Sequence, residues 1–351
     1  MRMRTAMKIL PVFALVVAVW AQAKLATQDS ATFDAEHAAH ITRVVPMPNT
    51  VSPEAQQYLI GLEQSAAGPE SLVDRRKRTD IWREKDSAEA RKLYPVDVQP
   101  ATIGGVQTDI IMPLAMPDAN RTRVLINLHG GGFNSDSGSL IEGVPIANLA
   151  KTKVVSVYYR LAPENPYPAA VDDVVAVYKE LLKTYRPSGI GIFGTSAGAI
   201  LTAQVTAKLK QFGIPLPAAI GIFSGFADFS RAGESRQLFT LTGFSGDLQP
   251  MDDNHLPDDP YVGKTDRKDP LLSPIFSDLR GWPSSLLVTS GRDILLSGTT
   301  IFHRALLKGG NDSQLIVFEA LPHAFWYHFQ IPETKEALEI MANFFGQKVG
   351  H

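Results

Sequence analysis

A five-residue pattern near the middle of the chain, Gly-Thr-Ser-Ala-Gly at 194–198, constrains the fold more than any other feature. It follows a short apolar run, 190–193, and precedes an alanine-rich stretch with the composition of a helix. This order predicts a strand, a sharp turn and a helix, with Ser196 at the apex of the turn. Glycines two residues to either side let the strand and the helix approach closely, so the serine hydroxyl can stand clear of the backbone as a nucleophile.

A run of glycines upstream adds a second part of the same chemistry. Three glycines come directly after His129, which itself follows the apolar run 124–128. The bare N–H groups of Gly131 and Gly132, with the amide of Ala197, can bind an oxyanion, and each such donor can lower a barrier by roughly 3–4 kcal/mol. A merely flexible loop is the alternative. A phosphate cradle is disfavoured because no Gly-Lys-Ser or Gly-Lys-Thr follows.

Apolar strands alternate with helical stretches over most of the chain, which predicts a mostly parallel sheet with helices on both faces. The strands are expected at 107–112, 124–128, 154–158, 190–193, 218–224, 285–289 and 314–318. The helices are expected at 142–151, 169–183, 197–211, 297–308 and 333–345, with a glycine pair at 309–310 as a helix stop.

Two further stretches complete a resemblance: Tyr-Arg-Leu-Ala-Pro-Glu at 159–164, running on to the acidic pair 172–173, and Asp-Pro-Leu-Leu-Ser-Pro at 269–274. With the two glycine motifs they span about 96–346 and resemble the hormone-sensitive-lipase-like branch of the α/β-hydrolase superfamily, also called family IV bacterial esterases. The resemblance implies an α/β-hydrolase fold, with a mostly parallel twisted sheet, helices on both faces and a mainly helical cap. Thr195 stands where many members carry aspartate, which indicates a Gly-Thr-Ser-Ala-Gly subgroup and removes the basis for borrowing the substrate preference of the aspartate-bearing members.

The serine requires a base, and the base an orienting acid, in the chain order Ser, Asp or Glu, His. Asp293 is the only carboxylate in the loop after the expected strand 285–289, so it is the candidate acid. A helix N-terminal acid favoured by the macrodipole is the alternative interpretation of this residue. Asp266, Asp269 and Asp278 are weaker substitutes, because none of them follows a strand.

The candidate base is His323, just past the last expected strand. A neutral imidazole whose other nitrogen faces Asp293 can take the serine proton and return it to a leaving alcohol. His328 is the rival, but it sits among aromatic residues, where packing is the better interpretation. His129 is expected to fix the glycine loop by hydrogen bonding.

The first 23 residues have the pattern of a secretory signal peptide. Three basic residues precede or adjoin the apolar run 9–20, and Ala-Gln-Ala at 21–23 offers a cleavage site, so a mature start at Lys24 is expected. An uncleaved anchor is the alternative, but the run is shorter than the roughly 20 residues that span a bilayer. The chain has no cysteine, which excludes lipoprotein attachment and disulfides. We expect a secreted or periplasmic protein with no stable membrane anchor after processing.

The segment 24–95 is expected to hold a poorly ordered lead-in, 24–49, and then helices. Ser-Pro at 52–53 indicates a helix start, and a second amphipathic stretch runs over 72–93. These helices precede the sheet, and in the resembling family this segment caps the active site.

The remaining residues, 96–351, are expected to form the catalytic domain. Within them the stretch 230–269 is rich in Gly, Pro and Asp and would contribute a second piece of the cap. A formal net charge of −2 gives no bias toward nucleic acid or anionic membranes. The basic run 75–78 is interleaved with acids and is interpreted as a solvated helix face.

Several polar residues are interpreted as structural support. Arg160 is expected to be buried and paired with Glu164 or Asp172, because a buried guanidinium needs a carboxylate partner. Asp228 would anchor the end of its strand. An acidic loop surrounds His255, but it lacks a regular ligand spacing, so no metal and no cofactor are expected.

The resemblance implies a serine carboxylesterase that hydrolyses short-to-medium acyl esters of small molecules through an acyl-enzyme. An exported lactonase, or a deacetylase acting on a carbohydrate or aromatic ester, is the alternative. A non-catalytic ligand-binding homologue is a distant one, because such homologues typically lose the serine or the histidine. The family often dimerises through its last strand and helix, so a homodimer is possible. The residues expected to line either a substrate pocket or the core are Phe226, Phe229, Phe239, Phe244, Met251 and Trp326.

Overall fold

A computed structural model describes residues 29–63, 70–136, 138–246, 248 and 256–350. The chain divides into two compact units, Met1–Pro48 and Asn49–His351. The expected leader, 1–23, lies outside the described residues. Among the described helices, none combines the length and the apolar character needed to cross a lipid bilayer.

The first unit contains an antiparallel pair of short strands, β1 (Ser30–Phe33) and β2 (Ala39–Thr42). The carboxylate of Asp34 closes the turn between them, because Oδ1 accepts hydrogen bonds from the amides of Glu36 and Ala38, both at 2.9 Å. The expectation of a poorly ordered lead-in is therefore wrong for 30–42. An aspartate that bonds backbone amides two and four residues on is a turn signal that apolar periodicity does not detect.

The second unit is built on an eight-stranded sheet with the order β10-β9-β8-β7-β5-β6-β4-β3. Its strands are β3 (Val96–Ile103), β4 (Val106–Pro113), β5 (Val124–Leu128), β6 (Lys153–Val157), β7 (Ile190–Thr195), β8 (Ala219–Phe223), β9 (Ser284–Arg292) and β10 (Ser313–Pro322). β4 runs antiparallel to both of its neighbours, and the pairs from β6 to β10 are parallel. The seven predicted strands correspond to β4 through β10. β3 was not predicted, since it is an edge strand interrupted by Pro100.

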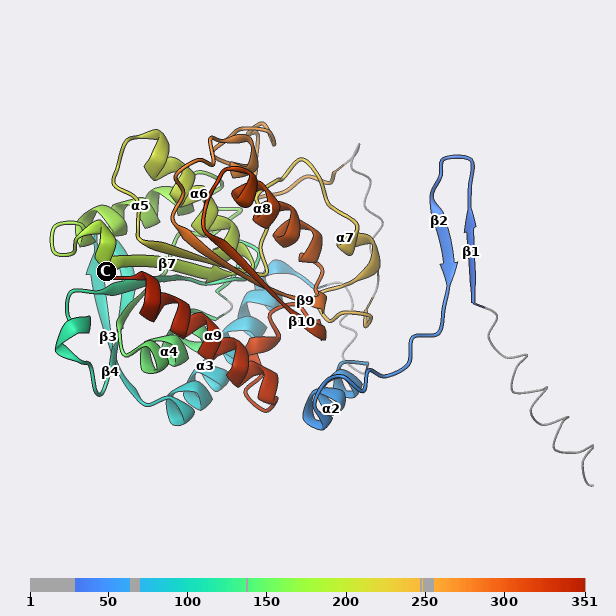
Figure 1. The fold of residues 1–351 in the computed structure, drawn as a ribbon, viewed down its shortest axis with the longest axis horizontal. Helices are drawn as coiled ribbons and strands as arrows, with labels where there is room; N and C mark the ends of the chain where they lie inside the picture. The colour runs from blue at the N-terminus through green and yellow to red at the C-terminus, as the bar shows by residue number, and fades with distance from the viewer. Residues whose placement is uncertain (1–28, 64–69, 137, 247, 249–255, 351) are drawn as a thin grey trace, which may run out of the picture. The chain divides into compact units, whose positions relative to one another are not determined.

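Helices cover both faces of the sheet (Figure 1). The α-helices among the described residues are α2 (Pro53–Leu62), α3 (Leu72–Leu93), α4 (Ser139–Ala150), α5 (Ala169–Leu181), α6 (Ala197–Gln211), α7 (Ser235–Leu238), α8 (Leu296–Lys308) and α9 (Pro332–Lys348). Buried side chains of α5, α6 and α8 form one hydrophobic cluster, and those of α4 and α9, with α2 and α3, form the other. The five helices predicted between and after the strands are confirmed, and Ser52 caps α2 by accepting from the amide of Ala55 at 3.0 Å.

The burial of the central strands explains why their sequences are continuous apolar runs. Every residue of β5, β7 and β8 is buried, as expected for parallel strands covered on both faces. Because parallel strands end at the same edge of a sheet, the loops after β5, β7, β9 and β10 meet there. Those four loops carry all the candidate site residues.

The two expected cap segments differ in structure. α2 and α3 are regular helices and belong to the same compact unit as the sheet. The described part of 230–269 contains only the single-turn helix α7 and is otherwise irregular.

Candidate active site

The turn between β7 and α6 places Ser196 at its apex. The residue has φ of 59° and ψ of −120°, a conformation that costs an L-residue on the order of 1–3 kcal/mol. A bond of 2.9 Å from its amide to the carbonyl oxygen of Phe223 holds it there. An added Cβ on Gly194 would lie 2.6 Å from the carbonyl carbon of Gly198, and one on Gly198 would lie 2.7 Å from the carbonyl oxygen of His129. Both glycines are thus required for strand and helix to approach.

Asp293 and His323 are brought together across 30 residues of chain. Asp293 directly follows β9 and His323 directly follows β10, and these neighbouring strands run parallel. His323 Nδ1 lies 2.8 Å from Asp293 Oδ1. The carboxylate is fully buried, and the histidine side chain is 8% exposed. This geometry leaves Nε2 as the imidazole nitrogen available for another partner.

Asp293 is surrounded by donors. Oδ2 accepts from the hydroxyls of Ser224 and Thr289, the latter at 2.7 Å, and Oδ1 also accepts from the amide of Leu295 at 2.9 Å. Burial raises the pKa of Asp293, but the charge of His323 and these hydrogen bonds outweigh it, so the pKa lies below its usual value. The group is therefore a carboxylate that holds an imidazole in one orientation.

Short connections link this pair to the nucleophile turn. Ser196 donates its amide to Phe223, and the next residue, Ser224, donates its hydroxyl to Asp293. The hydroxyl of Ser290 donates to the carbonyl oxygen of Pro322 at 3.0 Å, which fixes the loop that carries the histidine. Ser196, Asp293 and His323 thus lie at one edge of the sheet, and Ser196 is partly exposed.

The glycine loop adopts conformations that need glycine. Gly131 has φ of 103° and Gly132 has φ of 62°, both in the region that L side chains rarely adopt. The carbonyl oxygen of Gly131 accepts from the amides of Asn134 and Ser135, both at 3.1 Å, which curls the loop back on itself. Ala197 is the first residue of α6, so its amide has no acceptor within the helix.

His129 fixes the base of this loop, as predicted. Its ring is 1% exposed, contacts its neighbour Gly130 through Nδ1 to the carbonyl oxygen at 2.8 Å, and stacks on Tyr159 with centroids 4.1 Å apart. The Tyr159 hydroxyl donates to the His129 carbonyl oxygen at 2.6 Å.

Two arginines of α3 also hold the loop, and the sequence analysis missed both. Arg76 donates to the carbonyl oxygen of Asn134 at 2.7 Å, and its terminal nitrogens contact Glu164 at 2.7 and 2.8 Å. Those bonds lower the pKa of Glu164 to about 2. The basic run is therefore not simply a solvated face. Charge interleaving alone does not separate a solvated arginine from one that binds backbone carbonyls.

Arg83, two turns further along α3, reaches a buried carboxylate in the same loop. It contacts Asp136 at 2.6 Å, and Asp136 lies 3.6 Å from Nδ1 of His129. Burial raises the pKa of Asp136, but His129 and Arg83 lower it by more, so the pKa lies below its usual value. α3 thereby contributes two cations to the support of the glycine loop.

The rival residues have other roles. His328 is half-buried and packs against Tyr58, with ring centroids 4.4 Å apart, and desolvation lowers its pKa to about 4. Asp266 and Asp269 accept from backbone amides of their own turns. Asp278 forms ion pairs with Arg280 and Lys210.

The expected partners of Arg160 are wrong. Arg160 is half exposed and binds Asp173, with NH2 to Oδ1 at 2.8 Å. Glu164 binds Arg76, and Asp172 binds Lys208. The helical spacing explains the error, since Asp172 and Asp173 are adjacent on α5 but point in different directions.

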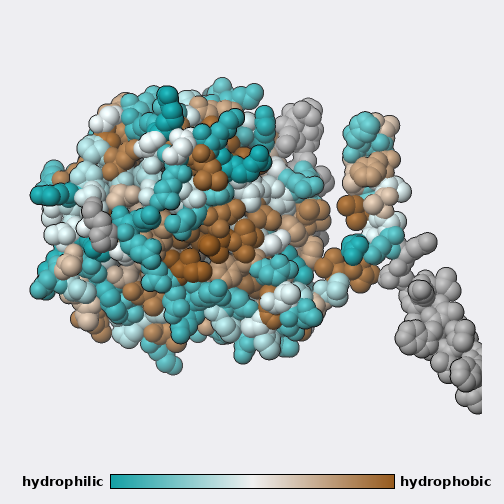
Figure 2. All heavy atoms as spheres, viewed as in Figure 1, coloured by the Kyte–Doolittle hydropathy of each residue, from teal (hydrophilic) through white to brown (hydrophobic). Residues whose placement is uncertain are grey.

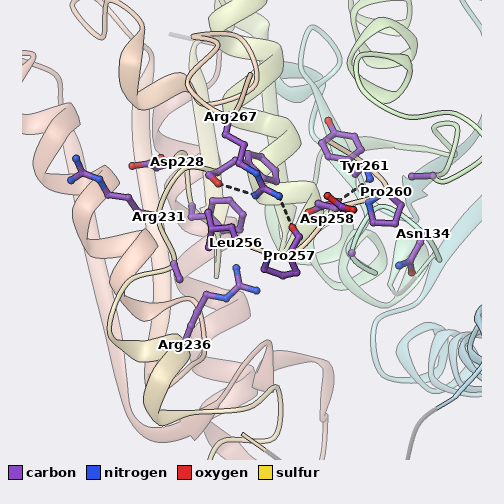
Figure 3. A pocket seen from close by; sticks show the side chains of 16 residues that line it. Asn134, Asp228, Arg231, Arg236, Leu256, Pro257, Asp258, Pro260, Tyr261 and Arg267 are labelled. Atoms are coloured by element: carbon purple, nitrogen blue, oxygen red, sulfur yellow. Dashed lines mark hydrogen bonds between the residues drawn. The ribbon is translucent and has the colours of Figure 1, made fainter. Parts of the chain in front are cut away.

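A cavity of about 260 Å³ is lined by Gly132 of the glycine loop and by residues of the segment after β8, among them Asp228 (Figure 3). Its walls include Asn134, Phe226, Phe229 and the side chain of Arg267. Arg267 crosses the cavity wall and donates to the carbonyl oxygens of Phe229 and Pro257 at 3.1 and 2.6 Å, which ties the two sides together (Figure 3). Asp228 also lines the cavity and accepts hydrogen bonds from the amide and the hydroxyl of Ser230, two residues further along the chain.

The six residues expected to line either a pocket or the core have different positions in the structure. Phe226 and Phe229 line the cavity and contact each other edge to face, with centroids 4.9 Å apart. Trp326 is fully buried in the core. Phe239 packs on Phe244, which is 53% exposed. Met251 lies outside the described residues.

Most of the acidic loop around His255 also lies outside the described residues. Of its two described aspartates, Asp259 accepts from the amides of Tyr261 and Val262. Within the described part of the chain, no three side chains of His, Asp or Glu gather as metal ligands would.

Comparisons with known proteins agree with this architecture. The family model of the alpha/beta hydrolase fold matches residues 125–327. An acetyl-hydrolase of Streptomyces hygroscopicus is 32% identical over 266 residues, which is 73% of this chain and 84% of that protein. An esterase of Acinetobacter venetianus is 29% identical over 272 residues, covering 72% of this chain and 84% of that protein.

Solved structures give the same result. The crystal structure of an esterase named E25 has a TM-score of 0.75 and 29% identity, covering 88% of this chain and 98% of that one. An esterase from the bacterial hormone-sensitive lipase family has a TM-score of 0.71 and 28% identity, covering 85% of this chain and 98% of that one. The chain therefore belongs to the α/β-hydrolase family, in its hormone-sensitive-lipase-like esterase branch.

Proposed function

We propose that this chain, a serine carboxylesterase, hydrolyses short-to-medium acyl esters with Ser196 as nucleophile, His323 as base and Asp293 as the orienting acid. The observation that carries the assignment is the 2.8 Å contact between His323 and Asp293 beside the strained turn of Ser196. The Gly-Thr-Ser-Ala-Gly subgroup follows from Thr195.

The reaction proceeds in two halves. His323 Nε2 takes the proton of the Ser196 hydroxyl as its oxygen forms a bond to the ester carbonyl carbon. The amides of Gly131, Gly132 and Ala197 bind the oxyanion, and the collapse of the tetrahedral intermediate expels the alcohol with the proton from His323. Water then attacks the acyl-enzyme with the same groups, which releases the acid and restores the serine.

The size of the cavity supports a small acyl group. A volume of about 260 Å³ is slightly below the roughly 300–1,000 Å³ of most ligand pockets. The two phenylalanines in its wall supply apolar contact, which suits acetyl to medium-length chains better than long ones.

A second candidate, a deacetylase acting on a carbohydrate ester, is favoured by one polar group. The amide oxygen of Asn134, which lines the same cavity, is buried and accepts no hydrogen bond from the described residues. A buried acceptor left unpaired is costly, and a sugar hydroxyl would satisfy it. One relative is an acetyl-hydrolase, which agrees with acetyl as the acyl group.

The test compares p-nitrophenyl esters from acetate to palmitate and a peracetylated sugar, using the exported protein, whose N-terminal sequence should begin at Lys24. Turnover should peak at short chains, and Ser196→Ala should reduce it by about 10⁴-fold or more. Ser284→Ala is the matched control. Ser284 is the first residue of β9, at the opposite end of the sheet, so this variant should hydrolyse the ester at the wild-type rate.

Other outcomes would change the assignment. Turnover that survives in Ser196→Ala would exclude the serine nucleophile. Lactone hydrolysis without ester hydrolysis would favour a lactonase, and retained ligand binding without any turnover would favour a non-catalytic homologue. A first residue before Lys24 would exclude the proposed cleavage.

Two further proposals concern assembly. We place α2, α3 and the stretch 230–269 in a cap, supported by Arg76 on the glycine loop and Arg267 in the cavity wall. We also propose a homodimer through β10 and α9. It is supported by the terminal position of β10 in the sheet and by the apolar side chains that gather on the face where both elements lie (Figure 2).

A further inference from the structure

A buried glutamate that the proposed mechanism does not use lies behind the nucleophile turn. Glu142 belongs to α4, the helix that follows the glycine loop, and it is fully buried. The hydroxyl of Thr195 donates to its Oε1 at 2.6 Å. The hydroxyl of Tyr327 faces its Oε2 at 3.5 Å.

Thr195 extends these contacts to a third element. Its hydroxyl oxygen accepts from the indole N–H of Trp326 at 3.1 Å. Trp326 and Tyr327 belong to the single turn η4 (Phe325–Tyr327), which begins two residues after His323. The same cluster therefore touches the residue directly before the nucleophile and the turn directly after the candidate base.

The cluster also reaches the end of the glycine loop. Gly138 precedes α4 with φ of 117°, and an added Cβ there would lie 2.7 Å from the Tyr327 hydroxyl. Glu142 therefore joins three elements. It belongs to the helix after the glycine loop, and its carboxyl group contacts Thr195 at the end of the nucleophile strand and Tyr327 in the turn after the histidine.

We propose that Glu142 is a positioning residue that holds the glycine loop, the nucleophile turn and the histidine loop in their working arrangement through Thr195 and Tyr327. This inference rests on the proposed function of Ser196 and His323. It assigns Glu142 no contact with the substrate, so its effect passes through the elements it joins.

The protonation state of Glu142 gives the proposal a measurable signature. Burial raises the pKa of Glu142 to about 8, although the hydrogen bonds from Thr195 and Tyr327 oppose the rise. Among the described residues, no ion pair involves Glu142. Arg83 on α3 binds Asp136 in the glycine loop instead. At neutral pH the group is a carboxylic acid, and it becomes an unpaired buried carboxylate in the alkaline range.

The remaining titratable groups near the cluster are distinguishable from it. Tyr327 on η4 is buried and its pKa lies well above the usual value, because of burial and of Glu142 itself. Asp136 acts on Tyr327 through its charge and is itself paired with Arg83 and His129. Of Glu142, Tyr327 and Asp136, Glu142 is the group whose pKa lies near 8.

The experiment measures the rate at which a fluorophosphonate labels Ser196, from neutral to alkaline pH, in the full chain. The wild type should label fast at neutral pH and lose reactivity with a midpoint near pH 8. Glu142→Gln, which keeps the shape and cannot ionise, should stay within about tenfold of the wild type at neutral pH and lack that midpoint. Tyr327→Phe removes a donor that lowers the Glu142 pKa, so it should move the midpoint upward.

A nonpolar variant tests the positioning itself. Glu142→Leu removes both contacts, and a misplacement of the reactive groups should slow labelling by about tenfold to a hundredfold at every pH. Glu180→Gln, an exposed glutamate on α5, is the matched control and should follow the wild type. If Glu142→Leu fails to fold, the pH profile of Glu142→Gln decides the question alone.

The proposal is wrong if Glu142→Gln keeps the alkaline midpoint of the wild type, or if folded Glu142→Leu labels at the wild-type rate. Failure of the proposed function looks different: the wild type would not be labelled at any pH. In that case the infrared carbonyl band of a protonated carboxylic acid decides. It should be present in the wild type at neutral pH, absent in Glu142→Gln, and lost on titration to alkaline pH.

Discussion

Two carboxyl groups near the nucleophile turn are equally buried and behave in opposite ways. Asp293 and Glu142 are both 0% exposed. The pKa of Asp293 lies below its usual value, whereas that of Glu142 is raised to about 8. Near neutral pH the first is a carboxylate and the second is a carboxylic acid.

The difference comes from the donors around each group. Burial raises both pKa values, because a low dielectric disfavours the charged form. Asp293 receives donors from Ser224, Thr289 and Leu295 and the positive charge that His323 can carry. Glu142 has one short hydrogen bond, from Thr195, and one long contact. The environment on the two sides of one turn therefore determines which carboxyl serves as an anion and which as a neutral linker.

The largest effect should separate the two groups by the same chemical change. Asp293→Asn should lower kcat by about 10⁴-fold, because an amide in place of the carboxylate stabilises the wrong tautomer of His323 and leaves its imidazolium without an anion. Glu142→Gln makes the same carboxyl-to-amide change and should cost less than about tenfold at neutral pH. The measurement is kcat on the best p-nitrophenyl ester. Equal losses in the two variants would contradict the comparison.

A second test concerns the pH dependence of folding stability. The folded-state pKa of Glu142 is raised from 4.5 to about 8, so the folded chain holds a proton that the unfolded chain has lost across that window. Wild-type stability should therefore fall with rising pH relative to Glu142→Gln, by on the order of 5 kcal/mol over the whole window. Urea unfolding of both proteins at several pH values measures this. A constant difference across the window would mean that Glu142 is not buried as a neutral acid.

The smallest effect should come from a single donor to Asp293. Ser224→Ala removes a hydroxyl bond to a buried anion and should lower stability near neutral pH by about 1.5–3 kcal/mol. The pKa of Asp293 is depressed in the folded state, so this loss should fade as the pH falls through that pKa.

Ser285→Ala is the matched control for that variant. Ser285 is equally buried but donates to a neutral carbonyl oxygen, that of Pro283, at 2.8 Å. Its removal should cost about 1 kcal/mol and should not depend on pH. If the two serine variants lose the same stability at all pH values, the charge of Asp293 is not what the Ser224 hydroxyl stabilises.

The sheet could be predicted because its central strands are buried on both faces. Short apolar runs such as β5 and β7 are typical of buried parallel strands. The glycines on both sides of Ser196 specify the turn between β7 and α6. The edge strand β3 alternates between exposed and partly buried residues and contains Pro100, so it lacks that signal. The β1–β2 pair depends on one carboxylate in a turn, which hydrophobic periodicity cannot detect.

The candidate triad was predictable from chain order, since each residue follows a strand. Its assignment stays a prediction until the variants are measured. The supporting residues on α3 and α4 were not predictable, because their partners are distant in sequence: Arg76 is 88 residues from Glu164, and Glu142 is 53 residues from Thr195. A charged or polar residue on a helix gives no local sign of such a partner.

The placement of α3 has a consequence for anyone who wants to shorten this protein. A version cut at Val96, where the sheet begins, would keep every residue of the candidate triad and all three oxyanion amides. It would lose the Arg76 bonds to the glycine loop and leave Asp136 buried without Arg83. Domain borders drawn from the α/β pattern alone would therefore discard two contacts that hold the glycine loop.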